Sequence, residues 1–248
     1  MNVKKSLFSG KAGRARYVVL LDPDKLTEQN ASEAAVSCSR NGVDALFVGG
    51  STADKHKFLS ITKVIKEHSR IPVILFPGGA DQIVPHADAV LFMSLLSGRN
   101  PRFLIEEQVR GAPLVREFGL ETVAMGYLLI ESDKPTAVEK VSGSAPLKRG
   151  DPVTALNHAL AAQYLGMDVV YLEAGSGANL TVPEDMISTV KQGISIPLIV
   201  GGGIKTPEEA SRKVAAGADI VVTGNVLEKS DFSSSLKAFA QAVHKARA

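Results

Sequence analysis

Three apolar runs in the second half of the chain each lead into glycine. The runs are residues 169–172, 197–200 and 220–223, and a glycine follows each within three positions. Apolar runs without polar alternation are typical of parallel strands that are covered on both faces. Glycine lets the backbone turn sharply and brings its N–H groups close to an anion. We interpret the three glycine turns as a cradle for a phosphate group.

The length of the chain and the order of its elements favour one barrel domain. A chain of 248 residues is long enough for a (β/α)8 barrel. Similar Gly-X-Asp triplets, beginning at Gly42, Gly166 and Gly217, precede three of the apolar runs. We therefore predict a single α/β domain over residues 1–248, of the TIM-barrel type. A doubly wound sheet, which requires the strand order to reverse, stays open as the alternative.

One connection is too short for an ordinary helix. The expected strands 72–76 and 89–92 are separated by about a dozen residues, which include prolines and glycines. A parallel crossover normally needs a helix and two turns. We expect a modified barrel in which this helix is missing or degenerate. Its loss would uncover an apolar flank made by some of Val73, Leu75, Val90 and Phe92.

Composition argues against several classes of protein. A net charge of +2 and an aromatic content of 5% give no basis for nucleic-acid binding. Cys38 is the only cysteine, which fits a reducing cytoplasm. The histidines show no metal-ligand spacing, and no apolar run is long enough to span a bilayer. We expect a soluble cytoplasmic protein with a short polar lead, residues 1–15, and a long connection, 131–150, that acts as a lid or binding loop.

Asp22 and Ser51 are the candidate metal ligands. Asp22 directly follows the expected strand 17–21, and Ser51 follows the strand 45–48. Magnesium is held by a few protein oxygens together with water and substrate phosphates. Asp22 could instead pair with Lys25, but its place at a strand end favours Mg²⁺.

Glu173 is the candidate for proton transfer. It leaves an apolar strand at the expected barrel mouth, where a carboxylate is costly unless it is paired or used. We interpret Tyr171 as facing the opposite way from Glu173. This orientation leaves open a role for Tyr171 in packing between the barrel and its helices.

Five short motifs match those of one known family. They are Leu-Asp-Pro-Asp-Lys at 21–25, Gly-Gly-Ser-Thr at 49–52, Tyr-Leu-Glu-Ala-Gly-Ser-Gly-Ala at 171–178, Gly-Gly-Gly-Ile-Lys at 201–205 and Gly-Asn at 224–225. From about residue 17 to its end, the sequence resembles the geranylgeranylglyceryl phosphate synthases, a family that includes bacterial heptaprenylglyceryl phosphate synthases. The Ala-Gly-Ser-Gly form is similar to the second group of this family. The resemblance implies a modified TIM barrel that lacks its third helix.

The resemblance also implies an activity and roles for residues. The activity is a prenyltransferase that joins sn-glycerol 1-phosphate to a polyprenyl diphosphate, with geranylgeranyl as the expected tail, and releases diphosphate. Asp22 and Ser51 would bind Mg²⁺, Glu173 would orient or deprotonate the hydroxyl, and Tyr171 would face the allylic cation. The residues implied to hold glycerol phosphate are Tyr171, Leu172, Glu173, Ala174, Gly175, Ser176, Gly177, Gly202, Gly203, Gly224 and Asn225.

Further expectations concern partners and competing functions. We expect a homo-oligomer that contacts a membrane transiently to deliver its lipid product. The uncovered flank would receive the prenyl tail, since each buried CH₂ contributes about 0.8 kcal/mol. The alternatives are another phosphate-binding TIM-barrel enzyme, either an isomerase or a phosphate-ester synthase, and a non-catalytic protein that binds a prenyl or phosphate ligand.

Overall fold

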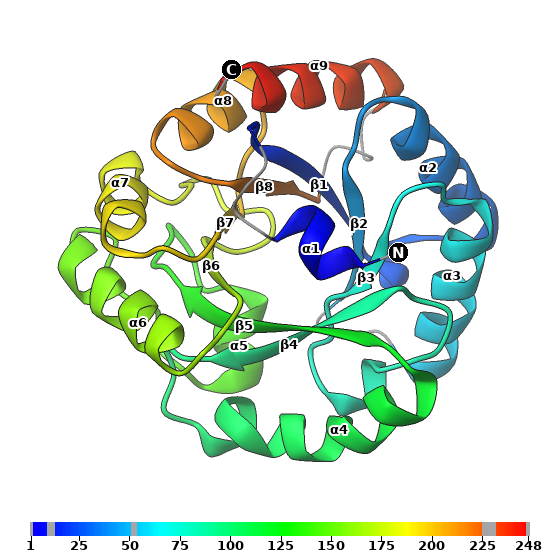
Figure 1. Cartoon of the computed structure of the whole chain (residues 1–248), viewed down its shortest axis with the longest axis horizontal. Coiled ribbons are helices and arrows are strands. Elements are labelled where there is room, and N and C mark those ends of the chain that lie inside the picture. The colour runs from blue at the N-terminus through cyan, green and yellow to red at the C-terminus, as the bar shows by residue number, and fades with distance from the viewer. Residues whose placement is uncertain (1, 9–12, 51–53, 225–231, 247–248) are drawn as a thin grey trace.

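Eight parallel strands, which follow one another in chain order, form the centre of the molecule. The structure is a computed structural model that describes residues 2–8, 13–50, 54–224 and 232–246. Within these ranges the strands close into a barrel (Figure 1). They are β1 (Arg16–Leu21), β2 (Ala45–Val48), β3 (Val73–Leu75), β4 (Ala89–Leu95), β5 (Glu121–Leu129), β6 (Val169–Glu173), β7 (Leu198–Gly201) and β8 (Ile220–Thr223). The prediction of a TIM-type barrel is confirmed, because a doubly wound sheet would be open.

Helices surround the barrel on the outside (Figure 1). They are α2 (Glu28–Arg40), α3 (Lys55–His68), α4 (Glu107–Phe118), α6 (Pro152–Tyr164), α7 (Glu184–Gly193), α8 (Pro207–Ala215) and α9 (Phe232–Lys245). Local sequence sets where several begin: Thr206 and Glu209 form a capping box at α8, and Asp151 accepts the Thr154 N–H at α6. Within the described ranges, no helix is long and apolar enough to cross a membrane.

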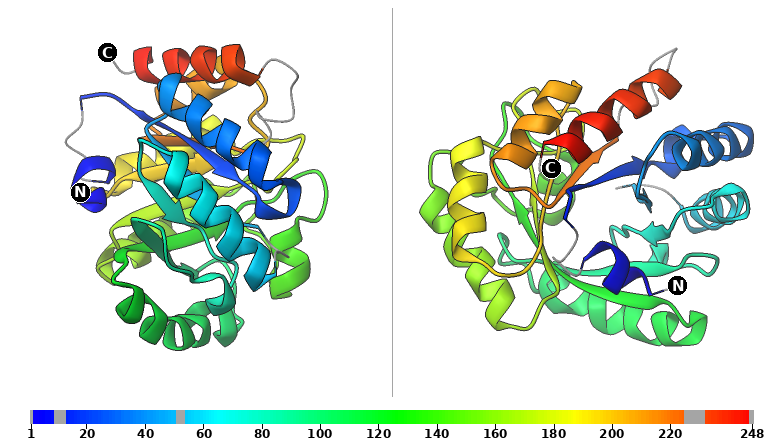
Figure 2. Two further views of the ribbon diagram at one scale, coloured as in Figure 1. Left: turned by 90° about the vertical axis from the view of Figure 1, so that its right-hand side faces the viewer. Right: turned by 45° about the horizontal axis from the view of Figure 1, so that its top comes forward.

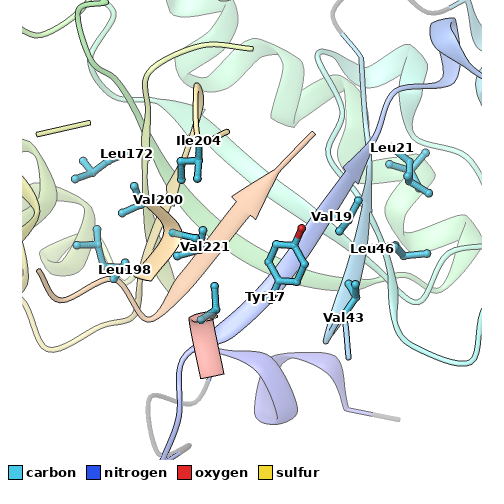
Figure 3. Packing of buried hydrophobic residues seen from close by; sticks show 14 of the residues in the cluster. Tyr17, Val19, Leu21, Val43, Leu46, Leu172, Leu198, Val200, Ile204 and Val221 are labelled. Carbon is cyan, nitrogen blue, oxygen red and sulfur yellow. The ribbon is translucent and has the colours of Figure 1, made fainter. Parts of the chain in front are cut away.

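The core has two layers because strand side chains alternate in direction. One layer fills the barrel and includes Phe47, Tyr127 and Tyr171. The other lies between the barrel and its helices, as the labelled side chains of Figure 3 illustrate. In this outer layer Tyr17 of β1 stacks on Phe239 of α9 with ring centroids 5.7 Å apart. The strands are thereby held from both sides, which fixes the positions of the loops that follow them.

The connection from β3 to β4 contains only a short 3₁₀ helix, η2 (Ala80–Gln82). The expected loss of a helix is therefore confirmed. The flank that this loss was expected to uncover is only partly bare. Val73 and Leu75 are fully buried, because Ile83 and Val84 of the connection join the same apolar cluster. Phe92 is half-buried.

The amino-terminal residues form a plug, not only a polar lead. Helix α1 (Val3–Leu7) places Val3, Leu7 and Phe8 in the apolar cluster of the barrel interior. The carboxylate of Glu121, the first residue of β5, accepts the N–H groups of Val3 and Lys4 at 2.7 and 2.8 Å. Figure 2 shows α1 at one end of the barrel. Since β5 begins at Glu121, this is the amino-terminal end, and the opposite end is the mouth.

The long connection 131–150 is more ordered in the structure than an open loop. Thr136 and Glu139 form a capping box that starts helix α5 (Ala137–Ser142). A parallel bridge between Ile130 and Leu147 closes the base of the segment. The segment, with α5, forms a wall beside the barrel mouth.

Candidate active site

Two cavities of different size open at the carboxyl ends of the strands. The larger one has a volume of about 650 Å³ and is lined largely by apolar side chains from β4, the β3–β4 connection, η3 (Arg102–Glu106) and α5. Helix α4 adds the polar side chains of Glu107 and Gln108. The smaller one has a volume of about 90 Å³ and lies over β6, β7 and β8. Residues that line both are Leu20, Glu173, Ser176 and Gly224. The two cavities are therefore neighbours.

The smaller cavity is bounded by glycine backbone. Gly177, Gly202 and Gly203 line it with φ angles of 69°, 87° and 72°, in the left-handed region that favours glycine. A Cβ on Gly203 would lie 2.9 Å from the Ala178 carbonyl oxygen, so the two loops are in close contact. Lys205 lies at the rim, and its Nζ donates to Asn179. Backbone N–H groups with one nearby cation form a suitable site for a phosphate monoester.

Glu173 lies at the junction of the two cavities and is 7% exposed. Its carboxylate accepts the Gly175 N–H at 2.6 Å and a hydrogen bond from the Tyr171 hydroxyl. Burial raises the pKa of Glu173, and these two hydrogen bonds oppose the rise without cancelling it. A carboxylate with a raised pKa, held by two donors, is well suited to accept a proton from an alcohol.

The structure corrects the predicted orientation of Tyr171. Residues two apart on a strand share a face, so Tyr171 and Glu173 both point into the barrel and form a hydrogen bond. The Tyr171 ring stacks on Tyr127 at 5.4 Å and meets Phe76 edge-on at 5.6 Å. Electron-rich rings in this arrangement attract a cation. A packing role between the barrel and its helices is excluded for Tyr171.

Phe76 and Tyr127 were not among the predicted site residues. Tyr127 pairs with Tyr171 in the register of β5 and β6. A sequence signal existed, since Tyr-Leu occurs at the same distance from the end of both strands. Phe76 directly follows β3, at the position that Asp22 holds after β1.

Asp22 lies at the end of β1 and lines the larger cavity. Its carboxylate accepts the Asp24 N–H at 3.1 Å, and burial raises its pKa despite that bond and the nearby charges of Lys25 and Lys57. Within the described ranges, no cluster of three or more His, Cys, Asp or Glu side chains forms a metal site. A single carboxylate at a phosphate site still fits Mg²⁺, which keeps water and phosphate ligands. Ser51 lies outside the described residues.

The other predicted phosphate-binding residues are distributed as follows. Leu172 and Ala174 are fully buried in the outer core layer, so only their backbone faces the loops. The Ala174 N–H donates to the Gly201 carbonyl, and Gly175 borders the larger cavity. Asn225 lies outside the described residues. The residues that the structure brings together around the smaller cavity are Tyr171, Glu173, Ser176, Gly177, Gly202, Gly203 and Gly224.

Comparisons with known proteins agree with this geometry. The model of the PcrB family matches residues 11–243. A geranylgeranylglyceryl phosphate synthase of Thermococcus gammatolerans is 50% identical over 214 residues, which are 86% of this chain and 84% of the relative. One of Flavobacterium johnsoniae is 44% identical over 88% of this chain and 90% of its own length. The crystal structure of (S)-3-O-geranylgeranylglyceryl phosphate synthase from Thermoplasma acidophilum with sn-glycerol-1-phosphate superposes with a TM-score of 0.93, at 35% identity and 99% coverage of each chain.

Proposed function

The chain belongs to the PcrB family, and we propose that it is a prenyltransferase of ether-lipid synthesis. It joins sn-glycerol 1-phosphate to a polyprenyl diphosphate through an ether bond and releases diphosphate. The observation that carries the proposal is the position of Glu173 between a small phosphate-type cavity and a large apolar one. Such a junction suits a reaction between a small phosphorylated alcohol and a long apolar chain.

The smaller cavity receives glycerol phosphate. Its glycine-rich backbone and Lys205 match the charge of a phosphate monoester, and its volume of about 90 Å³ suits a three-carbon substrate. The phosphate at the glycine turns leaves the free hydroxyl end of glycerol directed to Glu173. The relative from Thermoplasma acidophilum binds sn-glycerol-1-phosphate.

The larger cavity receives the prenyl diphosphate. Its apolar wall matches the tail, and Asp22 marks the end where the diphosphate would lie. Asp22 would hold Mg²⁺ there, together with Ser51, and the bound ion would neutralise charge on the departing diphosphate. The name of the relatives supports geranylgeranyl as the tail.

Bond formation takes place beside Glu173. The glycerol hydroxyl oxygen forms a bond to the allylic carbon, and the bond from that carbon to diphosphate oxygen breaks with its electron pair on the leaving group. The hydroxyl proton passes to the Glu173 carboxylate. The rings of Tyr171 and Tyr127 stabilise positive charge on the allylic carbon.

The location and the assembly state are further parts of the proposal. A reducing cytoplasm agrees with the buried free thiol of Cys38. Self-association would cover Tyr164 and Leu165 at the end of α6, which are 79% and 71% exposed. The protein would contact a membrane transiently and release its lipid product there.

The test is a product assay with sn-glycerol 1-phosphate, labelled prenyl diphosphates from C10 to C35, and a Mg²⁺ titration. We expect an organic-soluble phosphorylated ether, formed fastest with the C20 diphosphate. Asp22→Ala should lose the Mg²⁺-dependent turnover while it keeps the fold. Absence of product with every diphosphate would leave the isomerase and binding-protein alternatives. Full activity of Asp22→Ala at limiting Mg²⁺ would exclude Asp22 as the ligand.

A further inference from the structure

Glu107 is a buried carboxylate that the reaction does not use. It lies in the first turn of α4, is 9% exposed, and contacts three donors. Its Oε2 accepts the Ala80 N–H at 2.8 Å. Its Oε1 accepts Arg102 Nε at 2.8 Å, and Arg110 Nη1 lies 3.0 Å from both oxygens. Burying a charge is costly unless it is fully paired, so this arrangement requires an explanation.

The Ala80 contact joins α4 to the connection that lacks a helix. Ala80 is the first residue of η2, and a three-residue 3₁₀ helix has little stability of its own. A Cβ on Gly79 would lie 3.1 Å from Glu107 Oε2, so the backbone and the carboxylate are in close contact. One turn further along α4, Gly111 leaves room for the Ile83 side chain, which a Cβ there would meet at 2.5 Å. Glu107 and Gly111 thus form one docking face for the connection.

A second buried side chain holds the same connection from its other end. Gln82 accepts the Gly78 N–H at 2.7 Å and donates to the Gly50 carbonyl at 2.8 Å. Gly50 lies against Asp22, since a Cβ on it would meet Asp22 Oδ1 at 2.5 Å. The connection is therefore fastened between α4 and the loop that follows β2.

The β3–β4 connection, held in this way, forms one wall of the larger cavity. Gly78, Gly79, Ala80 and Ile83 all line that cavity, and none of them lines the smaller one. In an ordinary barrel a helix packed on the strands would fix such a segment. Here the hydrogen bonds of Glu107 and Gln82 hold it, together with the packing of Ile83 and Val84.

We propose that Glu107 is a positioning residue for the prenyl substrate: it replaces the missing helix as the anchor of the β3–β4 connection and sets the shape of the prenyl cavity. The inference rests on the proposed function for the identity of the substrate. Burial acts to raise the pKa of Glu107, but the Ala80 N–H and the two arginines lower it overall. The carboxylate is thus charged at neutral pH, as an ionic anchor requires.

The test compares Glu107→Ala with Glu106→Ala, the matched loss of an exposed carboxylate one residue earlier. A hydrogen bond to a charged group contributes enough that we expect the KM for geranylgeranyl diphosphate to rise about tenfold in Glu107→Ala. The KM for glycerol phosphate should stay within about twofold, because the smaller cavity shares none of these contacts. Glu107→Gln, which keeps an acceptor for Ala80, should fall between Glu107→Ala and the parent. Glu106→Ala should match the parent.

A second variant removes the donor of the same hydrogen bond, the Ala80 N–H. Ala80→Pro removes the N–H donor at the first position of η2 and places the ring Cδ against Glu107 Oε2, so this contact is lost. The extended backbone of Gly79 suits a residue before proline. This variant should produce the same selective rise in KM, and the double variant should be no worse than the worse single one. This comparison also covers the case in which Glu107→Ala does not fold.

Three results would overturn the proposal. They are additive effects in the double variant, an equal rise of both Michaelis constants, and a Glu107→Ala enzyme that behaves like Glu106→Ala. A parent protein that forms no ether product would instead refute the proposed function. The two failures are therefore distinguishable.

Discussion

The small cavity over β6–β8 is shaped by backbone, whereas the large cavity beside β3–β5 is shaped by side chains. Around the small one, glycines with positive φ bring two loops within contact distance. Around the large one, phenylalanine and valine side chains from several elements form the wall. A site formed by closely packed backbone has almost no room for an added side-chain atom. An apolar wall can lose one side chain and keep its other contacts. A single substitution should therefore weaken substrate binding strongly at the small cavity and moderately at the large one.

Glu173, which belongs to both cavities, should give the largest effect. Glu173→Gln removes the proton acceptor but keeps its shape, so turnover should fall by about 10²–10⁴ with little change in either KM. In the parent, kcat/KM should fall with decreasing pH at a higher pH than for an ordinary glutamate, since the pKa is raised. Steady-state kinetics with both substrates measure this. Glu117→Gln, an exposed change near the end of α4, is the control. A turnover within about threefold of the parent would remove Glu173 from the chemistry.

Gly203→Val should weaken the binding of glycerol phosphate and leave the binding of the prenyl diphosphate unchanged. The φ of 72° is strained for valine, and the new Cβ would press on the Ala178 carbonyl. We expect the KM for glycerol phosphate to rise about 10–100-fold, while the KM for the prenyl diphosphate is unchanged. Gly150→Val is the matched control, because no atom lies within 4 Å of a Cβ there. If both Michaelis constants rise together, the phosphate site lies elsewhere.

Phe92→Ala should weaken the binding of the prenyl substrate alone, by a smaller factor. Loss of one apolar wall side chain corresponds to about 1.5–3 kcal/mol of burial, or about tenfold or more in KM for a C20 diphosphate. A C10 diphosphate, whose shorter tail covers less of the wall, should be affected less. Thermal melting of the variant separates this effect from a loss of fold. An equal effect on C10 and C20 substrates would place the tail away from Phe92.

The smallest effect concerns stability at the junction. Because the folded-state pKa of Glu173 is raised, protonation of its carboxyl group favours the folded state. This contribution to the free energy of unfolding is present at low pH and is lost as the pH rises through that pKa. Glutamine resembles the protonated form at every pH. Glu173→Gln should therefore melt about 2–4 °C higher than the parent at pH 7, with the gain disappearing near pH 4. A gain that is the same at both pH values would have another cause.

Features that depend on backbone conformation were predictable from the sequence. The glycine turns after β6 and β7 and the short connection after β3 require particular residue types or lengths, and the structure has both where they were predicted. The capping box of Thr206 and Glu209 likewise follows from residue types at a fixed spacing. At α2 both Thr27 and Asn30 are of cap-forming types, and in the structure Thr27 caps the helix and accepts the Asn30 N–H. Both residue types favour caps, so local sequence alone did not discriminate between them.

Features that depend on contacts between distant segments were not predictable. Tyr127 becomes a site residue only when β5 and β6 pair in register. Val73 and Leu75 are covered by residues of their own connection, which sequence patterns alone did not indicate. The flank is for this reason only partly bare, and its Val90 and Phe92 line the larger cavity.

Helix α1 has a practical consequence for handling the protein. Its apolar side chains are inside the barrel, and the Glu121 carboxylate holds the N–H groups of Val3 and Lys4. An affinity tag or a solid support linked to the amino terminus would pull on a segment that closes the barrel. Helix α9 lies on the outside (Figure 1), and its last turn ends at Lys245. Purification handles and immobilisation chemistry therefore belong at the carboxyl terminus.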